Sequence, residues 1–381
     1  MNLKINNLIT MSILKPYSQL SEEQKELISF CTDTKENIFL EGPPWSGKAL
    51  TCLYSMRNVV EANGDCSLFM VSNNAMYGYI STALQELGVR EQAKIENKDK
   101  FFWKMAGDFR ISIDVNSDYR DNYDSILTNL LDEEIEKKYC LTVMSEVQDY
   151  LEKEWELIKR MSERIVCYGD FRQALYDNKV VRETIIGDCI HRELDYHYKG
   201  LASNKLMRVR DYFFNDSVDG KAKKDCCEME PLATDVKYSA VDINYGDELR
   251  AIAERIKALE GEQSRVAIIC PNNNRFAELS YYLKSKGVKH NYYEINGDLR
   301  NHDFNSTTPL FISIFNAEGL QFDNVILFGF DESNYIIEMK RREDRLRIIL
   351  YVGMTRARNT TYIIRSEDTV AELKGFNCLD H

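Results

Sequence analysis

The sequence predicts an α/β protein with two lobes, each built on a mostly parallel sheet covered by helices. Its 381 residues exceed twice the ~150 of a typical domain. Short apolar runs alternate with helical patterns over the first 190 residues, and the alternation returns after about residue 247. We therefore expect lobes at 1–190 and 191–381, with a loop or reduced insertion near 215–246.

The first lobe is expected to hold four buried strands joined by helices. Continuous short apolar runs predict the strands, at 37–40, 66–72, 139–144 and 164–168. Apolar residues at helical spacing predict the helices, at 22–31, 78–87 and 149–161. Strands that alternate with helices in this way favour a parallel sheet.

The second lobe repeats the pattern after a different kind of segment. Residues 215–246 contain adjacent cysteines, a lysine run and a proline, and we expect a loop with little packed structure. Strands are then expected at 265–270, 310–315, 325–330 and 361–364. Helices are expected at 247–259, 275–286 and 344–354, and Gly287 is placed to end the second of these.

Composition narrows the class of protein. Lys and Arg total 49 against 61 Asp and Glu, a net charge of −12, which disfavours a generally basic coat but leaves room for a local basic track. No apolar run approaches the ~18 residues of a membrane span. The ten cysteines form no CxxC pair, and the five histidines show no metal-ligand spacing. We expect a cytoplasmic protein with reduced thiols, no metal site of its own and no membrane association.

A phosphate-binding loop is predicted between the first strand and the next helical pattern. Residues 42–49 read GPPWSGKA, which fits G-x-x-x-x-G-K in the required strand–loop–helix context. Gly42 and Gly47 would let backbone N–H groups turn toward phosphates, and Lys48 would reach the terminal phosphates. Trp45 is unusual in such a loop, and stacking on a ligand and merely covering the loop both stay open.

The position after the lysine departs from the pattern. A Ser or Thr there normally gives a hydroxyl to Mg²⁺, but Ala49 has no side-chain oxygen. Thr51 is two places further on and would point elsewhere on a helix.

Further motifs follow along the chain. They are LSEEQ at 20–24, FMVSNNA at 69–75, VMSEVQD at 143–149, GDFRQALY at 169–176, LDYHYK at 194–199, EGLQFDNV at 318–325 and YVGMTRAR at 351–358. Their order resembles that of the UvrD/Rep-like branch of superfamily 1 helicases. Together they span nearly the whole chain. The resemblance implies two RecA-like P-loop NTPase lobes, with the large insertion domains of the family reduced or absent.

The resemblance also implies roles for individual residues. ATP would lie between the lobes, with Mg²⁺ weakly held if at all, and single-stranded nucleic acid would cross both lobes. The implied catalytic residues are Glu146, Gln173 and Arg356, the last acting as an arginine finger. The implied nucleotide-binding residues are Gln24, Gly42, Gly47, Lys48, Lys179, Lys199, Gly319 and Gln321. The implied nucleic-acid contacts are Ser72, Asn73 and Tyr176.

Several positions depart from the family pattern. Ser145 replaces the aspartate that holds Mg²⁺, so that position and Ala49 together lack both metal contacts. Asn178 replaces an aromatic residue that would stack on a base. Lys179 and Lys199 replace arginines and lose the bidentate fork.

Three functions stay open on these residues. The first is a nucleotide-gated, helicase-like protein that hydrolyses ATP weakly or not at all and acts on nucleic acid or a protein partner, for example a nuclease or another effector. The second is an active 3′-to-5′ single-strand translocase. The third is a non-catalytic interaction subunit. The basic cluster at 340–347 could likewise be an ordinary solvated helix or part of a binding surface.

Overall fold

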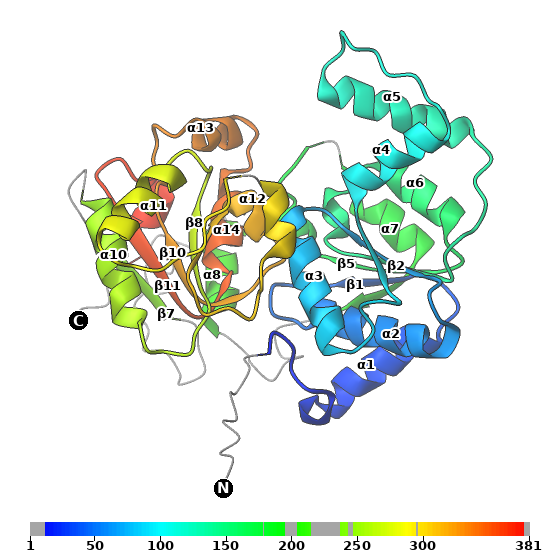
Figure 1. The fold of residues 1–381 in the computed structure, drawn as a ribbon, viewed down its shortest axis with the longest axis horizontal. Helices are drawn as coiled ribbons and strands as arrows, with labels where there is room; N and C mark the ends of the chain where they lie inside the picture. The colour runs from blue at the N-terminus through cyan, green and yellow to red at the C-terminus, as the bar shows by residue number, and fades with distance from the viewer. Residues whose placement is uncertain are drawn as a thin grey trace, which may run out of the picture.

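The computed structural model describes residues 12–177, 179–194, 204–214, 237–242, 247–294 and 296–376. Two sheets lie side by side, each flanked by helices, and the chain passes from the first to the second (Figure 1). All the strand pairs within the two sheets are parallel. The expected fold class is therefore confirmed. None of the described helices is long and apolar enough to cross a membrane.

The first sheet has six strands in the order β3-β2-β4-β5-β1-β6. Its strands are β1 (Ile38–Glu41), β2 (Ser67–Val71), β3 (Lys94–Asn97), β4 (Leu141–Met144), β5 (Ile165–Gly169) and β6 (Ile190–Glu193). Its helices are α1 (Glu22–Asp33), α2 (Lys48–Asn63), α3 (Asn74–Glu86), α4 (Lys98–Asp108), α5 (Tyr119–Asp132), α6 (Glu152–Met161) and α7 (Arg182–Asp188). The four strands β1, β2, β4 and β5 are buried throughout, as their apolar runs predict.

The second sheet has five strands in the order β7-β11-β10-β8-β9. Its strands are β7 (Lys237–Asp242), β8 (Val266–Cys270), β9 (Leu310–Ser313), β10 (Phe322–Leu327) and β11 (Ala357–Arg365). Its helices are α8 (Asn204–Phe214), α10 (Glu248–Leu259), α11 (Phe276–Ser285), α12 (Ile314–Ala317), α13 (Tyr335–Arg342), α14 (Leu346–Met354) and α15 (Ala371–Lys374). Gly287 follows α11 with φ +70°, the left-handed conformation expected at a helix end.

Short 3-10 turns link several of these elements. They are Tyr17–Gln19, Val147–Asp149, Phe171–Gln173 and Asn296–Asn301. Two of them follow β4 and β5 directly, at the carboxyl edge of the first sheet, where parallel sheets place their ligands.

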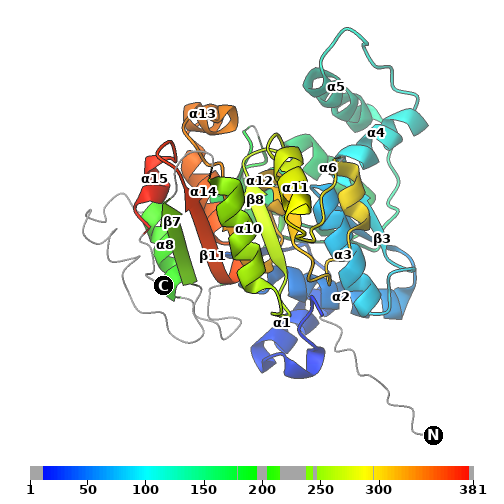
Figure 2. The same ribbon diagram turned by 60° about the vertical axis from the view of Figure 1, so that its left-hand side comes forward.

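The helices α4 and α5 project from the first lobe, beyond the layer of helices that covers its sheet (Figures 1 and 2). They lie between Ser72 and Ser145, where the family resemblance predicts a reduced insertion. A loop of ten residues joins them, and Tyr123 and Phe102 are buried at their base. This pair of helices is a small embellishment of the lobe.

Three expectations from the sequence differ from the structure. Within the segment 215–246, where a loop is expected, Lys237–Asp242 form the strand β7, which pairs with β11; residues 215–236 and 243–246 lie outside those that the structure describes. The lobe boundary expected at residue 190 falls in β6, which pairs with β1, so the first sheet extends to Glu193. The thiols are not all reduced, because Cys66 and Cys140 form a disulfide between the starts of β2 and β4.

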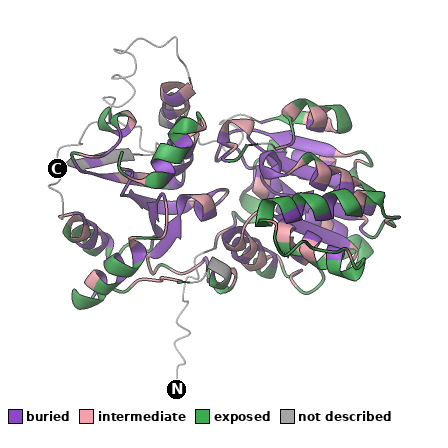
Figure 3. Ribbon diagram, turned by 90° about the horizontal axis from the view of Figure 1, so that it is seen from above, coloured by how far each residue is buried: buried purple, intermediate pink, exposed green. Residues whose placement is uncertain are grey.

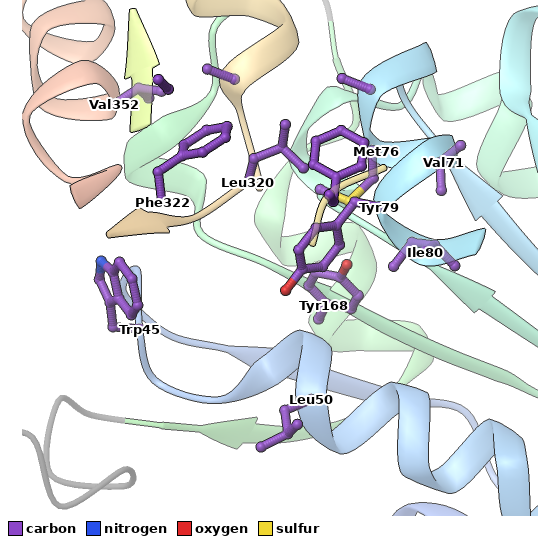
Figure 4. Packing of buried hydrophobic residues seen from close by; sticks show 14 of the residues in the cluster. Trp45, Leu50, Val71, Met76, Tyr79, Ile80, Tyr168, Leu320, Phe322 and Val352 are labelled. Carbon is purple, nitrogen blue, oxygen red and sulfur yellow. The ribbon is translucent and has the colours of Figure 1, made fainter. Parts of the chain in front are cut away.

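The buried residues gather on both faces of the two sheets, while the outer faces of the helices are exposed (Figure 3). The largest apolar cluster is continuous from one lobe to the other. Within it, Met76 and Tyr79 of α3 lie close to Leu320 of the second lobe, and Trp45 lies near Phe322 (Figure 4). The two lobes therefore share a packed seam.

Candidate functional site

The phosphate loop begins where β1 ends and closes at the first residue of α2. Gly47 takes φ +97° and occupies the N-cap position of α2, so the loop turns sharply into the helix. Gly42 is needed for a different reason. A Cβ on this residue would lie 2.5 Å from the backbone oxygen of Leu194. The loop conformation that the sequence motif predicts is therefore built into the fold.

Lys48 is buried and points back into its own loop. Its Nζ donates to the backbone oxygens of Gly42 at 2.5 Å and Pro43 at 2.8 Å. Burial lowers the pKa of Lys48, and the nearby carboxylates of Glu146 and Asp170 oppose this shift. The ammonium group is thus held among carbonyl oxygens that an incoming anion would displace.

A cavity of about 470 Å³ lies over this loop and between the lobes. Its volume is within the ~300–1,000 Å³ typical of ligand sites. Ala49 and seven of the predicted site residues line it: Gly47, Lys48, Glu146, Gln173, Gly319, Gln321 and Arg356. The fold therefore brings together residues that are as many as 309 positions apart in the sequence.

Arg356 reaches the cavity from the second lobe and contacts the first. Its Nη2 donates to Gln173 Oε1 at 2.7 Å, and its Nε donates to the backbone oxygen of Val352 at 2.8 Å. Arg356 is buried. Because the guanidinium group is planar and already bonded on two sides, its direction toward the cavity is fixed.

A group of buried carboxyls lies beside Arg356 at the seam. Gln148 Nε2 donates to Glu146 at 3.0 Å and to Glu318 of the second lobe at 3.4 Å. Burial raises the pKa of Asp149 to about 6, and burial together with Asp149 raises the pKa of Glu318 well above its usual range. Glu318 faces Asp149, so a proton on one carboxyl lets it donate to the other.

Glu146 combines a special backbone conformation with a close neighbour. Its φ is +49°, which is uncommon for a residue other than glycine. Gly319 of the second lobe has φ +75°, and a Cβ there would lie 2.1 Å from Met76 Cε and 3.1 Å from Glu146 Oε1. A side chain at position 319 would be strained by this φ and would crowd Met76 and Glu146, so the position favours glycine.

The two positions that would hold Mg²⁺ in the family supply no free oxygen. Ala49 lines the cavity with a methyl group. Ser145 is buried, and its Oγ donates to the backbone oxygen of Met70 at 3.3 Å. Thr51 is also buried and does not line the cavity. In the part of the chain that the structure describes, no three His, Cys, Asp or Glu side chains gather as a metal site.

Several of the predicted nucleotide contacts lie away from the cavity. Gln24 does not line it; its Oε1 accepts from the Ser21 backbone N–H at 3.1 Å in a helix cap, and its Nε2 has no hydrogen-bond partner among the described residues. Gln19 borders the cavity instead. Lys179 also lies elsewhere, with its Nζ 5.3 Å from the centre of the Tyr176 ring. Lys199 falls outside the residues that the structure describes.

The predicted nucleic-acid contacts fall in two places. Ser72 and Asn73 line an open groove at the start of α3. Tyr176 does not line this groove, and its ring lies 5.9 Å from that of Phe315 in the second lobe. Asn178 lies outside the described residues.

Trp45 is the principal residue whose role sequence reasoning left open. It takes φ +69° in the phosphate loop, and its ring is buried. Its indole Nε1 donates at 2.9 Å to the backbone oxygen of Thr355, the residue before Arg356. Trp45 therefore ties the phosphate loop to the loop that carries the arginine. The motif gives no signal for this contact, because the partner lies 310 residues away.

Two arginines at the cavity were also not predicted as site residues. Arg265, which borders the cavity, pairs with Asp323 through its Nε at 3.1 Å. Arg358 is exposed and lines the cavity as well. Both belong to segments that the sequence analysis recognised, but no spacing rule distinguishes them from surface arginines.

The basic cluster at 340–347 is largely neutralised by neighbouring acids. Arg341 pairs with Glu332 and Glu372, and Arg342 pairs with Glu338. Lys340 and Arg345 of the same cluster contact the first lobe. Lys340 Nζ donates to the backbone oxygen of Leu175 at 2.8 Å, and Arg345 pairs with Asp177. These two residues hold the lobes together.

Comparison with known proteins gives one family match, which lies in the second lobe. Residues 296–368 match the family model of the UvrD-like helicase C-terminal domain. No curated protein matches the chain. Among solved structures, the chain is similar to the C-terminal domain of a possible DNA helicase from Lactobacillus plantarum WCFS1, at 18% identity over 46% of this chain and 91% of that one, with a TM-score of 0.33.

It is also similar to Arterivirus nonstructural protein 10, a helicase, at 14% identity. That likeness covers 90% of this chain and 61% of the viral one, with a TM-score of 0.40. The family match at 296–368 includes Gly319, Gln321 and Arg356, the second-lobe side of the cavity. Residues 296–368 of the second lobe are thus similar to the C-terminal domain of UvrD-like helicases.

Proposed function

We propose that this chain binds ATP between its two lobes and hydrolyses it weakly or not at all. The observation that carries the proposal is the composition of the interlobe cavity. Lys48, Gln173 and Arg356 line it, but Ala49 and the inward-turned Ser145 offer nothing to a metal ion. Cations for binding phosphate are therefore retained, while the groups that fix the metal are replaced.

The residues present fit a nucleotide triphosphate. Lys48 would exchange its two carbonyl partners for phosphate oxygens, at the N-terminus of the 16-residue helix α2. Arg356 would approach the same phosphates from the second lobe, since its direction is fixed by Gln173 and Val352. Gln19, at another part of the cavity lining, has an amide side chain that could hydrogen-bond the base.

The residues present fit Mg²⁺ less well. This ion usually binds one or two carboxylates together with substrate phosphates, and it neutralises charge on the phosphates during transfer. Glu146 is the one carboxylate among the described cavity-lining residues. Glu146 would also have to orient the attacking water, so one side chain would carry both tasks. Slow turnover follows from that conflict.

The proposal includes a second ligand, which is single-stranded nucleic acid or a protein partner. The family resemblance and the groove at Ser72 and Asn73 support nucleic acid. A partner such as a nuclease is suggested by the small insertion α4–α5, which leaves few elements outside the two lobes to separate strands.

An active 3′-to-5′ motor is the main competing function. The Gln173–Arg356 hydrogen bond across the seam favours it, because coupling between the lobes is what a motor needs. A purely structural subunit is the other competitor, and it would not require the charged groups that line the cavity.

Binding and turnover of ATP separate these functions when they are measured on the same preparation. Calorimetric titration with ATP and Mg²⁺ is expected to show binding, and steady-state hydrolysis is expected to stay near the background rate with or without single-stranded DNA. Turnover that DNA stimulates would establish the motor. No binding by the wild-type chain would leave the structural subunit.

A further inference from the structure

We propose that single-stranded nucleic acid lies in the groove beside α3, α4 and α5, with a base stacked on Trp103 and Tyr119. This inference deepens the nucleic-acid part of the proposed function and rests on it. Neither aromatic residue belongs to the motifs that carry the family resemblance. They come from the small insertion that projects from the first lobe (Figure 1).

The groove is large enough and joins both lobes. It encloses about 520 Å³ and opens to solvent, and its first-lobe side includes Ser72, Asn73 and Asn97. Asn316 of α12 contributes from the second lobe. Asn73 Nδ2 donates to the backbone oxygen of Phe315 at 3.5 Å, which closes the seam between the lobes at one end of the groove.

Trp103 and Tyr119 line the groove and form an aromatic cluster with Tyr123 behind them. The Trp103 and Tyr119 ring centres are 5.7 Å apart, and Trp103 Nε1 donates to the Tyr119 hydroxyl at 3.2 Å. Behind them Tyr119 stacks on buried Tyr123 at 5.9 Å with an angle of 7° between the planes. Tyr119 is 56% exposed. The cluster is therefore supported from the protein side and open on the other, which is the arrangement that single-strand binding proteins use for bases.

A positive charge lies at the same groove. Lys100, in the first turn of α4, is exposed, lines the groove and forms no ion pair with any described residue. Asp99 also lines the groove, and its carboxylate is paired with Lys98 at 2.9 Å. Ser72 Oγ has no hydrogen-bond partner within the described part of the chain. A backbone phosphate beside Lys100 would lie next to a base on the aromatic pair.

The chemistry favours a single strand over a duplex. Stacking requires a base whose face is free, whereas the bases of a duplex are stacked on each other. A single unpaired lysine supplies little of the phosphate neutralisation that a duplex-binding surface needs, and the whole chain carries a charge of −12. We therefore expect weak dependence of binding on salt and strong dependence on the presence of bases.

Fluorescence anisotropy with a labelled oligothymidylate tests the proposal. Trp103→Ala and Tyr119→Ala are each expected to weaken binding about tenfold, and Trp103→Phe is expected to restore most of it. Tyr281→Ala is the matched control, because Tyr281 is an 80% exposed tyrosine on α11 that does not line the groove. An oligonucleotide made of abasic sites is expected to bind weakly to the wild-type chain. Its affinity should be about that of oligothymidylate for Trp103→Ala. Thermal melting of each variant checks that it is folded.

The outcomes separate this inference from the function on which it rests. Wild-type binding that survives both alanine substitutions would overturn the inference alone. Equal binding of the abasic and thymidine oligonucleotides, or tighter binding of duplex than of single strand, would also overturn it. If the wild-type chain binds ATP but no oligonucleotide, the nucleic-acid part of the proposed function fails too. ATP binding by Trp103→Ala should match the wild type, since Trp103 does not line the interlobe cavity.

Discussion

Two groups of residues at the interlobe site differ in what they offer a nucleotide. Lys48, Gln173 and Arg356 line the cavity, are buried and are held by hydrogen bonds with named partners. The other group is the pair of positions that the family resemblance implies for Mg²⁺. Ala49 presents a methyl group to the cavity, and Ser145, which does not line it, donates its hydroxyl to a backbone oxygen in the sheet. The first group suits anions, and the second supplies no metal ligand.

Under the proposed function, this difference means that ATP binding and ATP turnover depend on separate groups of residues. Phosphate affinity comes from cations and helix N-termini, which are present. Turnover needs the metal that spreads the charge of the transition state, and Glu146 alone remains to hold it. A chain can therefore keep the affinity while it loses the chemistry.

Removing the cation is expected to have the largest effect. Lys48→Met keeps the length of the side chain and removes the charge that faces Glu146 and Asp170. We expect ATP affinity to fall about 100-fold or more in calorimetric titration, because charge-assisted contacts to phosphate are lost. Lys25→Met, at a surface lysine on α1 paired with Glu22, is the control and should bind as the wild type does. Unchanged affinity in Lys48→Met would contradict the role given to the phosphate loop.

The carboxyl pair at the seam is expected to make stability depend on pH. The pKa of Asp149 is raised from 3.8 to about 6, so the folded chain holds a proton that the unfolded chain releases. The stabilisation is complete below about pH 4 and is lost as pH rises through about 6. We expect the unfolding free energy of the wild type to lose about 2 kcal/mol over that window relative to Asp149→Asn.

Urea unfolding of both proteins at several pH values measures the difference. The groups that face this pair are Glu146, Lys98, Lys179 and Arg356, and they are the same in both proteins. Parallel pH profiles for the wild type and Asp149→Asn would show that Asp149 and Glu318 do not share a proton in the folded state.

The contact of Trp45 with the second lobe is expected to have the smallest effect. Trp45→Phe keeps an aromatic ring and removes the donor to the backbone oxygen of Thr355. We expect a loss of about 1 kcal/mol in unfolding free energy and a change of about fivefold in ATP affinity, because the arginine loop is no longer tied to the phosphate loop. Trp155→Phe removes an indole hydrogen bond to Asp188 within the first lobe. The Trp155→Phe control should lose stability without a change in ATP affinity. If Trp45→Phe and Trp155→Phe change the ATP affinity equally, the hydrogen bond from Trp45 to Thr355 does not position the arginine loop.

Apolar runs in the sequence were enough to predict most of the strands, and the strands that were missed share a physical cause. The buried strands β1, β2, β4 and β5 follow from apolar runs, since both faces of each are covered. The strands β3, β6 and β7 were missed because their sequences, KIEN, IHRE and KYSAVD, mix polar and apolar residues, as suits the edge of a sheet. A strand that is covered on fewer sides has no continuous apolar run to detect.

The site was predictable where a motif fixes a position in the fold. Lys48, Glu146 and Gln173 meet at one cavity because they follow the carboxyl ends of the parallel strands β1, β4 and β5. Arg356 reaches the same cavity from the turn between α14 and β11. Gln24 follows the motif equally well, yet its side chain caps a helix. The tie at Trp45 and the ring cluster at Trp103 depend on tertiary contacts, which no spacing in the sequence encodes.

The most direct test of the central claim is ATP hydrolysis by the wild type and by the double variant Ala49→Thr/Ser145→Asp, with ATP binding measured on both. The wild type is expected to bind ATP with turnover near background. The double variant is expected to bind ATP comparably and to turn over at least tenfold faster in Mg²⁺, because both metal ligands return. A folded double variant that binds ATP without any gain in turnover, or a wild type that already hydrolyses ATP rapidly, would contradict the account.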